Sequence, residues 1–243
     1  MDEDIKNMKY ATVKDYKYAR WFEDVKYNGK TLNDSERRYL ISVLDESIEL
    51  YSQGLSIDHE AIERHKDYHY EFNKQYKTLN SIMLFTHITM IDSMVVGKYF
   101  LKADKDYERK FMRGKLFVLL NEGFKKLYGF NEASFKRSEW NRLLPLMKYL
   151  PEQINLQYQE LTYRLEKQSK SSSWWKDERN YETHLDAENL YKSRQEEIIE
   201  SKVMMSVNKL YSILLAINAF LSNVHACYLN SALSQYRNKS SKG

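Results

Sequence analysis

Cysteine, proline and glycine are scarce in this chain of 243 residues, which contains one cysteine, two prolines and seven glycines. The single thiol, that of Cys227, cannot form an intrachain disulfide and disfavours a zinc site built from cysteines. With so few turn-forming residues, a fold of many short strands and tight hairpins is also disfavoured. The composition therefore favours long helices and an all-α fold.

Several familiar catalytic motifs are missing as well. The sequence has no Gly-rich phosphate-binding loop, no dinucleotide-binding glycine pattern, no serine nucleophile elbow and no His-Glu-x-x-His element. None of the six histidines follows a glutamate by three residues, so the Glu-x-x-His pair of di-iron bundles is absent too. We therefore expect neither a metal nor a cofactor.

The chain also lacks the features of an exported protein. Residues 1–4 are acidic and are not followed by the apolar run of a signal peptide. Residues 210–236 carry no charge and are long enough to cross a bilayer, but their asparagine, serine and histidine side chains would be costly in lipid. We expect a buried central helix there, no membrane span and a cytoplasmic location.

Hydrophobic residues make up 42% of the chain, which is enough for a substantial core. Their spacing predicts a first helix with Asn33 or Asp34 as its N-cap, which runs through Ser52 and is ended by Gly54. A second, long helix is predicted to begin at Ser56. The serines between residues 169 and 173 predict a loop. The predicted helices cover residues 34–52, 56–103, 104 or 106 to 128, 151–168 and 188–235.

These helices predict an antiparallel bundle over residues 56–243, preceded by an N-terminal helical extension over residues 1–55. The last helix carries apolar residues in alternating steps of four and three, which is a heptad pattern. Such a stripe is typical of packing within an antiparallel bundle, or of a coiled-coil-like contact between two copies. Its members are Val203, Val207, Leu210, Leu214, Ile217, Leu221, Val224 and Tyr228.

The net charge is small, +4 from 38 basic and 34 acidic residues. This balance permits a phosphate-bearing partner but does not identify one. The runs Lys125-Lys126 and Arg37-Arg38 are too short to predict a nucleic-acid surface on their own.

One short element does indicate a chemistry. The residues from Arg179 to His184 have the sequence Arg-Asn-Tyr-Glu-Thr-His, after the serine-rich segment and before the last helix. The imidazole of His184 can transfer a proton near neutral pH, and the guanidinium of Arg179 can hold a phosphate through a transition state. On RNA the ribose 2′-hydroxyl would be the nucleophile, so this pair could cleave the chain without a metal.

This element resembles the signature of the HEPN superfamily (higher eukaryotes and prokaryotes nucleotide-binding), which is Arg, then Asn, His or Asp, three variable residues and His. The helical setting is similar too. The resemblance implies a HEPN-like bundle and a homodimer with a composite, metal-independent endoribonuclease site, in which Arg179, Asn180 and His184 are catalytic. It also implies a role as a toxin, an antiphage effector or an RNA-processing enzyme, with RNA or a nucleotide as ligand and a protein antitoxin or regulator as partner.

A second match to the same pattern lies earlier, at Arg64-His65-x-x-x-His69. We favour the later match because it precedes the apolar final helix, whereas the earlier one lies in a polar helical stretch. His65 and His69 share one helical face and could hold a metal, but two solvated histidines are the commoner arrangement.

The later match also has a non-catalytic interpretation. Asp177 and Glu178 would lie favourably in the first turn of a helix, and Arg179 would pair with a neighbouring carboxylate. In the catalytic interpretation, one of these two carboxylates would instead help to orient Arg179. The sequence therefore leaves two hypotheses, an endoribonuclease and a non-catalytic helical module that binds a nucleotide or a partner.

Overall fold

The computed structural model of the chain describes residues 31–65, 73–129, 132–171, 180, 182–183 and 187–240. Within these ranges the regular elements are helices and no strand occurs, which confirms the all-α prediction. The long helices are α2 (Asp34–His65), α3 (Asn73–Lys102), α4 (Asp106–Tyr128), α7 (Glu152–Ser171) and α10 (Glu200–Ser240). The shorter ones are α5 (Glu132–Phe135), η3 (Asn141–Leu143), α6 (Leu144–Met147) and α9 (Ala187–Gln195).

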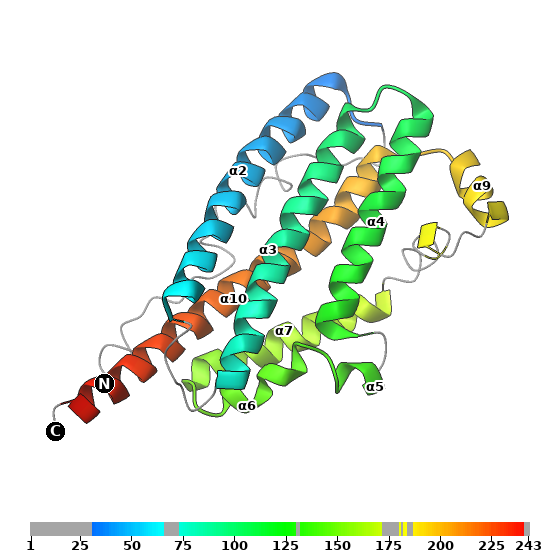
Figure 1. The fold of residues 1–243 in the computed structure, drawn as a ribbon. Helices are drawn as coiled ribbons and strands as arrows, with labels where there is room; N and C mark the ends of the chain where they lie inside the picture. Colours follow the sequence, from blue (N-terminus) through cyan, green and yellow to red (C-terminus); the bar gives the residue numbers. More distant parts are fainter. Residues whose placement is uncertain are drawn as a thin grey trace.

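The helices α2, α3 and α4 follow one another in alternating directions, and α10 crosses behind them (Figure 1). The central helix α3 packs against α2, α4 and α10, and α10 also packs against α7. Neighbouring helices that run antiparallel bury their apolar faces against one another over most of their length. The fold is thus an antiparallel bundle around α3 and α10.

The start of α2 confirms the predicted N-cap. The backbone N–H of Glu36 donates to Asn33 Oδ1 at 2.9 Å, and the backbone N–H of Asn33 donates to Glu36 Oε2 at 2.9 Å. This reciprocal pair is a capping box, which satisfies two amides that a helix start would otherwise leave without partners.

The predicted end of this first helix is wrong, because α2 continues through Gly54 and Ser56 to His65. The ring of His87 on α3 lies over Gly54. A Cβ atom added at position 54 would lie 3.9 Å from Cε1 of His87, which is an ordinary contact. The hydroxyl of Ser56 donates to the carbonyl of Ser52 inside the helix, so it does not cap a new one. The boundary expected between residues 55 and 56 therefore lies within one continuous helix.

The long helix predicted from Ser56 to residue 103 is also wrong. It is replaced by the last part of α2 and by α3, which begins at Asn73 and runs back along α2 (Figure 1). The prediction for α4 is confirmed at both ends. Gly129 follows the helix with a φ of 85°, and its N–H donates to the carbonyl of Lys125 at 2.8 Å, as expected for a helix that ends at glycine.

Two predictions near the C-terminus need correction. The serine-rich segment does not begin a loop at residue 169, because α7 extends to Ser171. The single final helix predicted over 188–235 is divided into α9 and α10, with residues 196–199 between them.

The apolar stripe of the last helix lies in the core. Its described members are buried, and from Ile213 to Leu221 every side chain is buried, so α10 is enclosed on all sides there as predicted for a central helix. The stripe packs on α3 and α7 within one chain. The thiol of Cys227 is buried on the same helix.

Among the described residues, one helix is long and apolar enough to be considered for a membrane span, α3 over Tyr76–Lys102. Of its most apolar stretch, 56% is buried inside the bundle. The buried core helix of a globular protein has the same length and composition, so this finding gives little support to a membrane span.

Candidate functional site

The structure describes three residues of the element from Arg179 to His184, namely Asn180, Glu182 and Thr183. The predicted catalytic residues Arg179 and His184 lie outside the described residues, as do the supporting residues Asp177 and Glu178. Asn180 and Thr183 are exposed. The position of the element on the bundle is therefore defined by Glu182.

Glu182 is buried between α4 and α9, with 5% of its side chain exposed. Its Oε1 atom pairs with the guanidinium of Arg194 on α9, and its Oε2 atom lies 3.9 Å from Nζ of Lys115 on α4. A buried carboxylate is stable only where cations or hydrogen-bond donors compensate for its lost hydration. The two cations supply that compensation.

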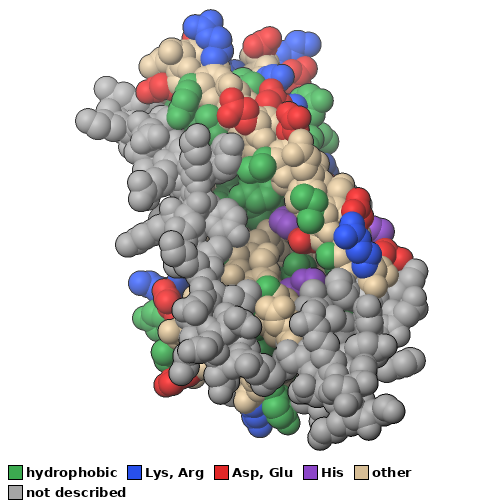
Figure 2. Space-filling view, turned by 90° about the vertical axis from the view of Figure 1, so that its left-hand side faces the viewer, with side chains coloured by type: hydrophobic (Ala, Val, Ile, Leu, Met, Phe, Trp, Pro, Cys, Tyr) green, Lys and Arg blue, Asp and Glu red, His purple; other side chains and the backbone are tan. Residues whose placement is uncertain are grey.

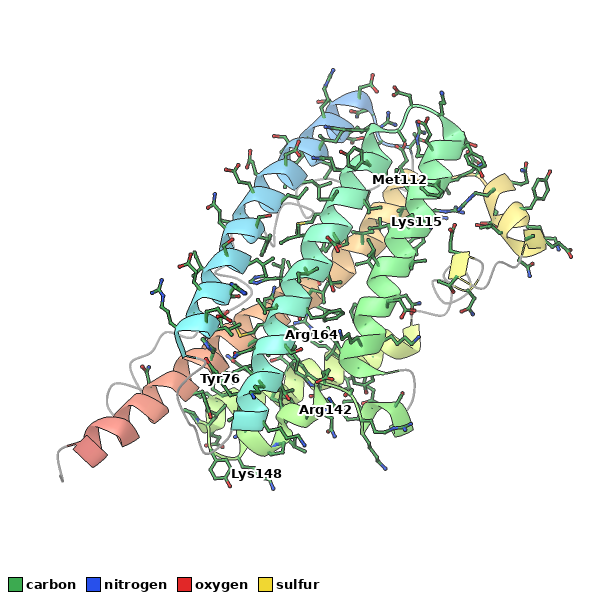
Figure 3. The ribbon with its side chains drawn as sticks, viewed as in Figure 1. Tyr76, Met112, Lys115, Arg142, Lys148 and Arg164 are labelled. Atoms are coloured by element: carbon green, nitrogen blue, oxygen red, sulfur yellow. The ribbon has the colours of Figure 1, made fainter. Side chains whose placement is uncertain are left out.

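Gly114 on α4 makes room for this carboxylate. A Cβ atom at position 114 would overlap the side chain of Glu182, so any other residue would displace it. We refer to Gly114, Lys115, Glu182 and Arg194 as the α4–α9 clamp. Figure 3 shows Lys115 on the side of α4 that faces α9.

Further hydrogen bonds hold α9 to α4. The guanidinium of Arg194 donates to the carbonyl of Lys110 at 2.9 Å. In the opposite direction, Arg113 of α4 donates to the carbonyl of Ser193 at 3.0 Å and to its hydroxyl at 2.9 Å. Because charge-assisted hydrogen bonds are the stronger ones, these reciprocal arginines fix the helix that follows the element.

Glu182 is one of the three variable positions of the motif, so the motif does not reveal the role of this carboxylate. Its partners are 12, 67 and 68 residues away in the chain, so no local spacing identifies it. The one available signal is Gly114 itself, a glycine inside a good helix-forming stretch, which often marks a close approach by another group.

The second match to the motif, from Arg64 to His69, has less structural support as a functional site. Arg64 is exposed on α2 and pairs with Glu60 one turn earlier at 3.0 Å, an ordinary surface ion pair of small energetic value. His65 is the last residue of α2, but its side chain and the whole of His69 lie outside the described residues.

A second charged cluster joins three helices near the N-terminal end of α4, next to the clamp. Glu200, the first residue of α10, has 1% of its side chain exposed. Nη2 of Arg37 on α2 lies 3.0 Å from both of its carboxylate oxygens, and Nη1 of Arg109 on α4 lies 3.1 Å from Oε1. A carboxylate at a helix N-terminus is also favoured by the helix dipole. This cluster joins α2, α4 and α10.

Two histidines, His87 and His225, make contacts within the bundle. Nε2 of His225 lies 3.1 Å from the hydroxyl of Tyr76, whose ring stacks on the imidazole. Burial raises the pKa of Tyr76, and a hydrogen bond with Asn80 partly opposes this effect.

The other histidine, His87 of α3, lies with Nδ1 3.0 Å from Oδ2 of Asp58 on α2. On the face drawn in Figure 2, histidine side chains lie in a hollow beside hydrophobic side chains. Over the described ranges, no group of three or more histidine, cysteine, aspartate or glutamate side chains could hold a metal ion.

Comparisons with family models, with curated proteins and with solved structures find no match to this chain. The interpretation of the site therefore depends on its own residues and their geometry.

Proposed function

We propose that the element from Arg179 to His184 is half of a metal-independent endoribonuclease site of the HEPN type. The observation that supports this most directly is the burial of Glu182 at the centre of the element, in the α4–α9 clamp. The clamp attaches the element to the rigid bundle while Asn180 and Thr183 remain exposed. A reactive group is effective when a rigid scaffold positions it and solvent or substrate can still reach it.

In this proposal His184 accepts the proton of a ribose 2′-hydroxyl, whose oxygen attacks the adjacent phosphorus. The 5′-oxygen of the next nucleotide leaves and takes up a proton, so that the products are a 2′,3′-cyclic phosphate and a 5′-hydroxyl. Arg179 stabilises the charge on the phosphate oxygens, and Asn180 orients the substrate or His184 by hydrogen bonds. Two copies of the chain meet so that their elements form one composite site.

The test uses the purified full chain, labelled RNA and EDTA. We expect cleavage that is reduced by about 100-fold or more in His184→Ala and in Arg179→Ala, the loss typical of a missing acid–base group or phosphate clamp. His59→Ala serves as the matched control, because His59 is an exposed histidine of α2, and it is expected to cleave normally.

Cleavage that persists in both variants would contradict the proposal and direct attention to Arg64 and His69. RNA binding without any cleavage by the unmodified chain would favour the alternative, a non-catalytic binding module. A chain that is monomeric by light scattering at concentrations where it cleaves RNA would rule out the composite site.

A further inference from the structure

The net charge of the chain is concentrated in one segment. Residues 125–148 contain six of the 38 basic residues and two of the 34 acidic ones, a net of +4. The remaining residues therefore contain 32 of each sign, and their charges balance. Excess positive charge that is confined to one segment produces a positive electrostatic potential near that segment and not over the whole surface.

The fold fixes this segment at one end of the bundle. Trp140 is fully buried, its Nε1–H donates to the hydroxyl of Thr162 on α7 at 2.8 Å, and its ring stacks on Tyr158. Its backbone N–H donates to the carbonyl of Leu127 at the end of α4. Trp140 thus attaches the segment to both helices, and Leu143, Leu146 and Met147 add to the same core.

Most cations of the segment face solvent. They are exposed at Lys126, Lys136, Arg137, Arg142 and Lys148, a set that we call the basic cap. Figure 3 shows Arg142 and Lys148 at the same end of the bundle. Arg142 pairs with Glu139 at 2.7 Å, the one described carboxylate within the segment.

An exposed ring lies next to these charges. Tyr149 directly follows Lys148, and 67% of its surface is exposed. Basic side chains interleaved with an exposed aromatic ring are suited to a polyanion with flat bases, because the cations contact phosphates and the ring stacks on a base.

We infer that the basic cap binds the phosphate backbone of single-stranded RNA and that Tyr149 stacks on one of its bases. An unpaired strand fits better than a duplex because a tyrosine can stack only on a base that is free of its helix. The inference rests on the proposed function, for which the cap would hold the substrate. In Figure 1, α5 of the basic segment and α9, which follows the candidate element in the chain, both lie on the right-hand side of the bundle.

The test measures binding of the full chain to a single-stranded 2′-O-methyl RNA, which cannot be cleaved because its 2′-hydroxyls are blocked. Arg142→Glu with Lys148→Glu is expected to weaken binding by about tenfold or more near 100 mM salt. The slope of log affinity against log salt should fall in magnitude by about 1.4, at roughly 0.7 for each lost phosphate contact on a single strand. Tyr149→Ala should weaken binding without changing this slope.

The matched control is Lys102→Glu with Lys105→Glu, which makes the same change in net charge at exposed positions at the opposite end of α4. It is expected to change the affinity by less than about threefold, because screening limits distant charges. Circular dichroism and thermal unfolding verify that both double variants are folded.

Equal weakening by the two double variants would overturn the inference, as would unchanged binding in the cap variant. Binding to anionic phospholipid vesicles in place of the oligonucleotide would overturn it too. Since the oligonucleotide is not a substrate, loss of binding in the cap variant supports the inference even if the RNA cleavage assay fails, and normal binding contradicts it even if cleavage succeeds.

Discussion

Gly114 is the residue whose small size decides where the candidate element lies. A glycine inside a helix costs about 1 kcal/mol relative to alanine, yet one occurs in the middle of α4, directly beneath the carboxylate of Glu182. The missing side chain provides the space in which Glu182 meets Arg194 and Lys115. At the scale of single residues, the clamp is a close approach that only glycine permits.

Replacing Gly114 with alanine tests this relation. Although alanine favours the helix, its Cβ would displace Glu182, so we expect Gly114→Ala to destabilise the fold by about 1 to 3 kcal/mol, as overpacking does. In a chain that already carries Glu182→Ala the overlap is gone, and the same change should be neutral or stabilising by up to about 1 kcal/mol. Urea unfolding of the four chains in this cycle measures both effects, and equal effects in the two backgrounds would show that the clamp does not form.

At the scale of single helices, the sequence predicts a helix end correctly where residues close to that end determine it. The Asn33 capping box and the Gly129 stop lie in short stretches of sequence, so their chemistry can be recognised without knowing the fold. Gly54 misled the prediction because a glycine can end a helix or can lie inside one. Its place under His87 depends on α3, a different segment of the chain.

These two glycines predict opposite effects of alanine. Gly54→Ala should stabilise the protein by about 0.5 to 1 kcal/mol, since its new Cβ would make an ordinary contact with His87 and alanine favours a helix. Gly129→Ala should destabilise it by more than about 1 kcal/mol, because φ is 85° there and the Cβ would press on Ser134 and Phe135. Thermal unfolding of the two variants measures this contrast, and a loss of stability at Gly54 would instead indicate that α2 ends there.

At the scale of the whole molecule, the final helix predicted over 188–235 is two helices, and ion pairs to distant segments lie where the second one begins. Residues 196–199 contain neither proline nor glycine, so nothing local predicts the break before α10. The break places Glu200 between Arg37 and Arg109, which lie 163 and 91 positions earlier in the chain. The α4–α9 clamp is equally non-local, which is why the sequence located the candidate element but missed the residues that hold it.

Removing the charge of Glu200 should therefore loosen the bundle as a whole. Glu200→Gln leaves two arginines beside a neutral amide, and we expect a loss of about 3 kcal/mol in unfolding free energy, as for other buried pairs that lose one partner. Glu139→Gln breaks the more exposed pair with Arg142 and should cost less than about 1 kcal/mol. Guanidinium unfolding of both variants compares them, and similar losses would mean that the buried cluster contributes no more than a surface pair.

The single cysteine allows the opening of the bundle core to be measured by the rate at which its thiol is labelled. The thiol of Cys227 is 2% exposed on the central helix, and a thiol reagent can react only when α10 separates from its neighbours. No other cysteine competes for the reagent. The rate of labelling therefore reports how often the core opens, so ligands and substitutions anywhere in the molecule can be ranked by their effect on that frequency.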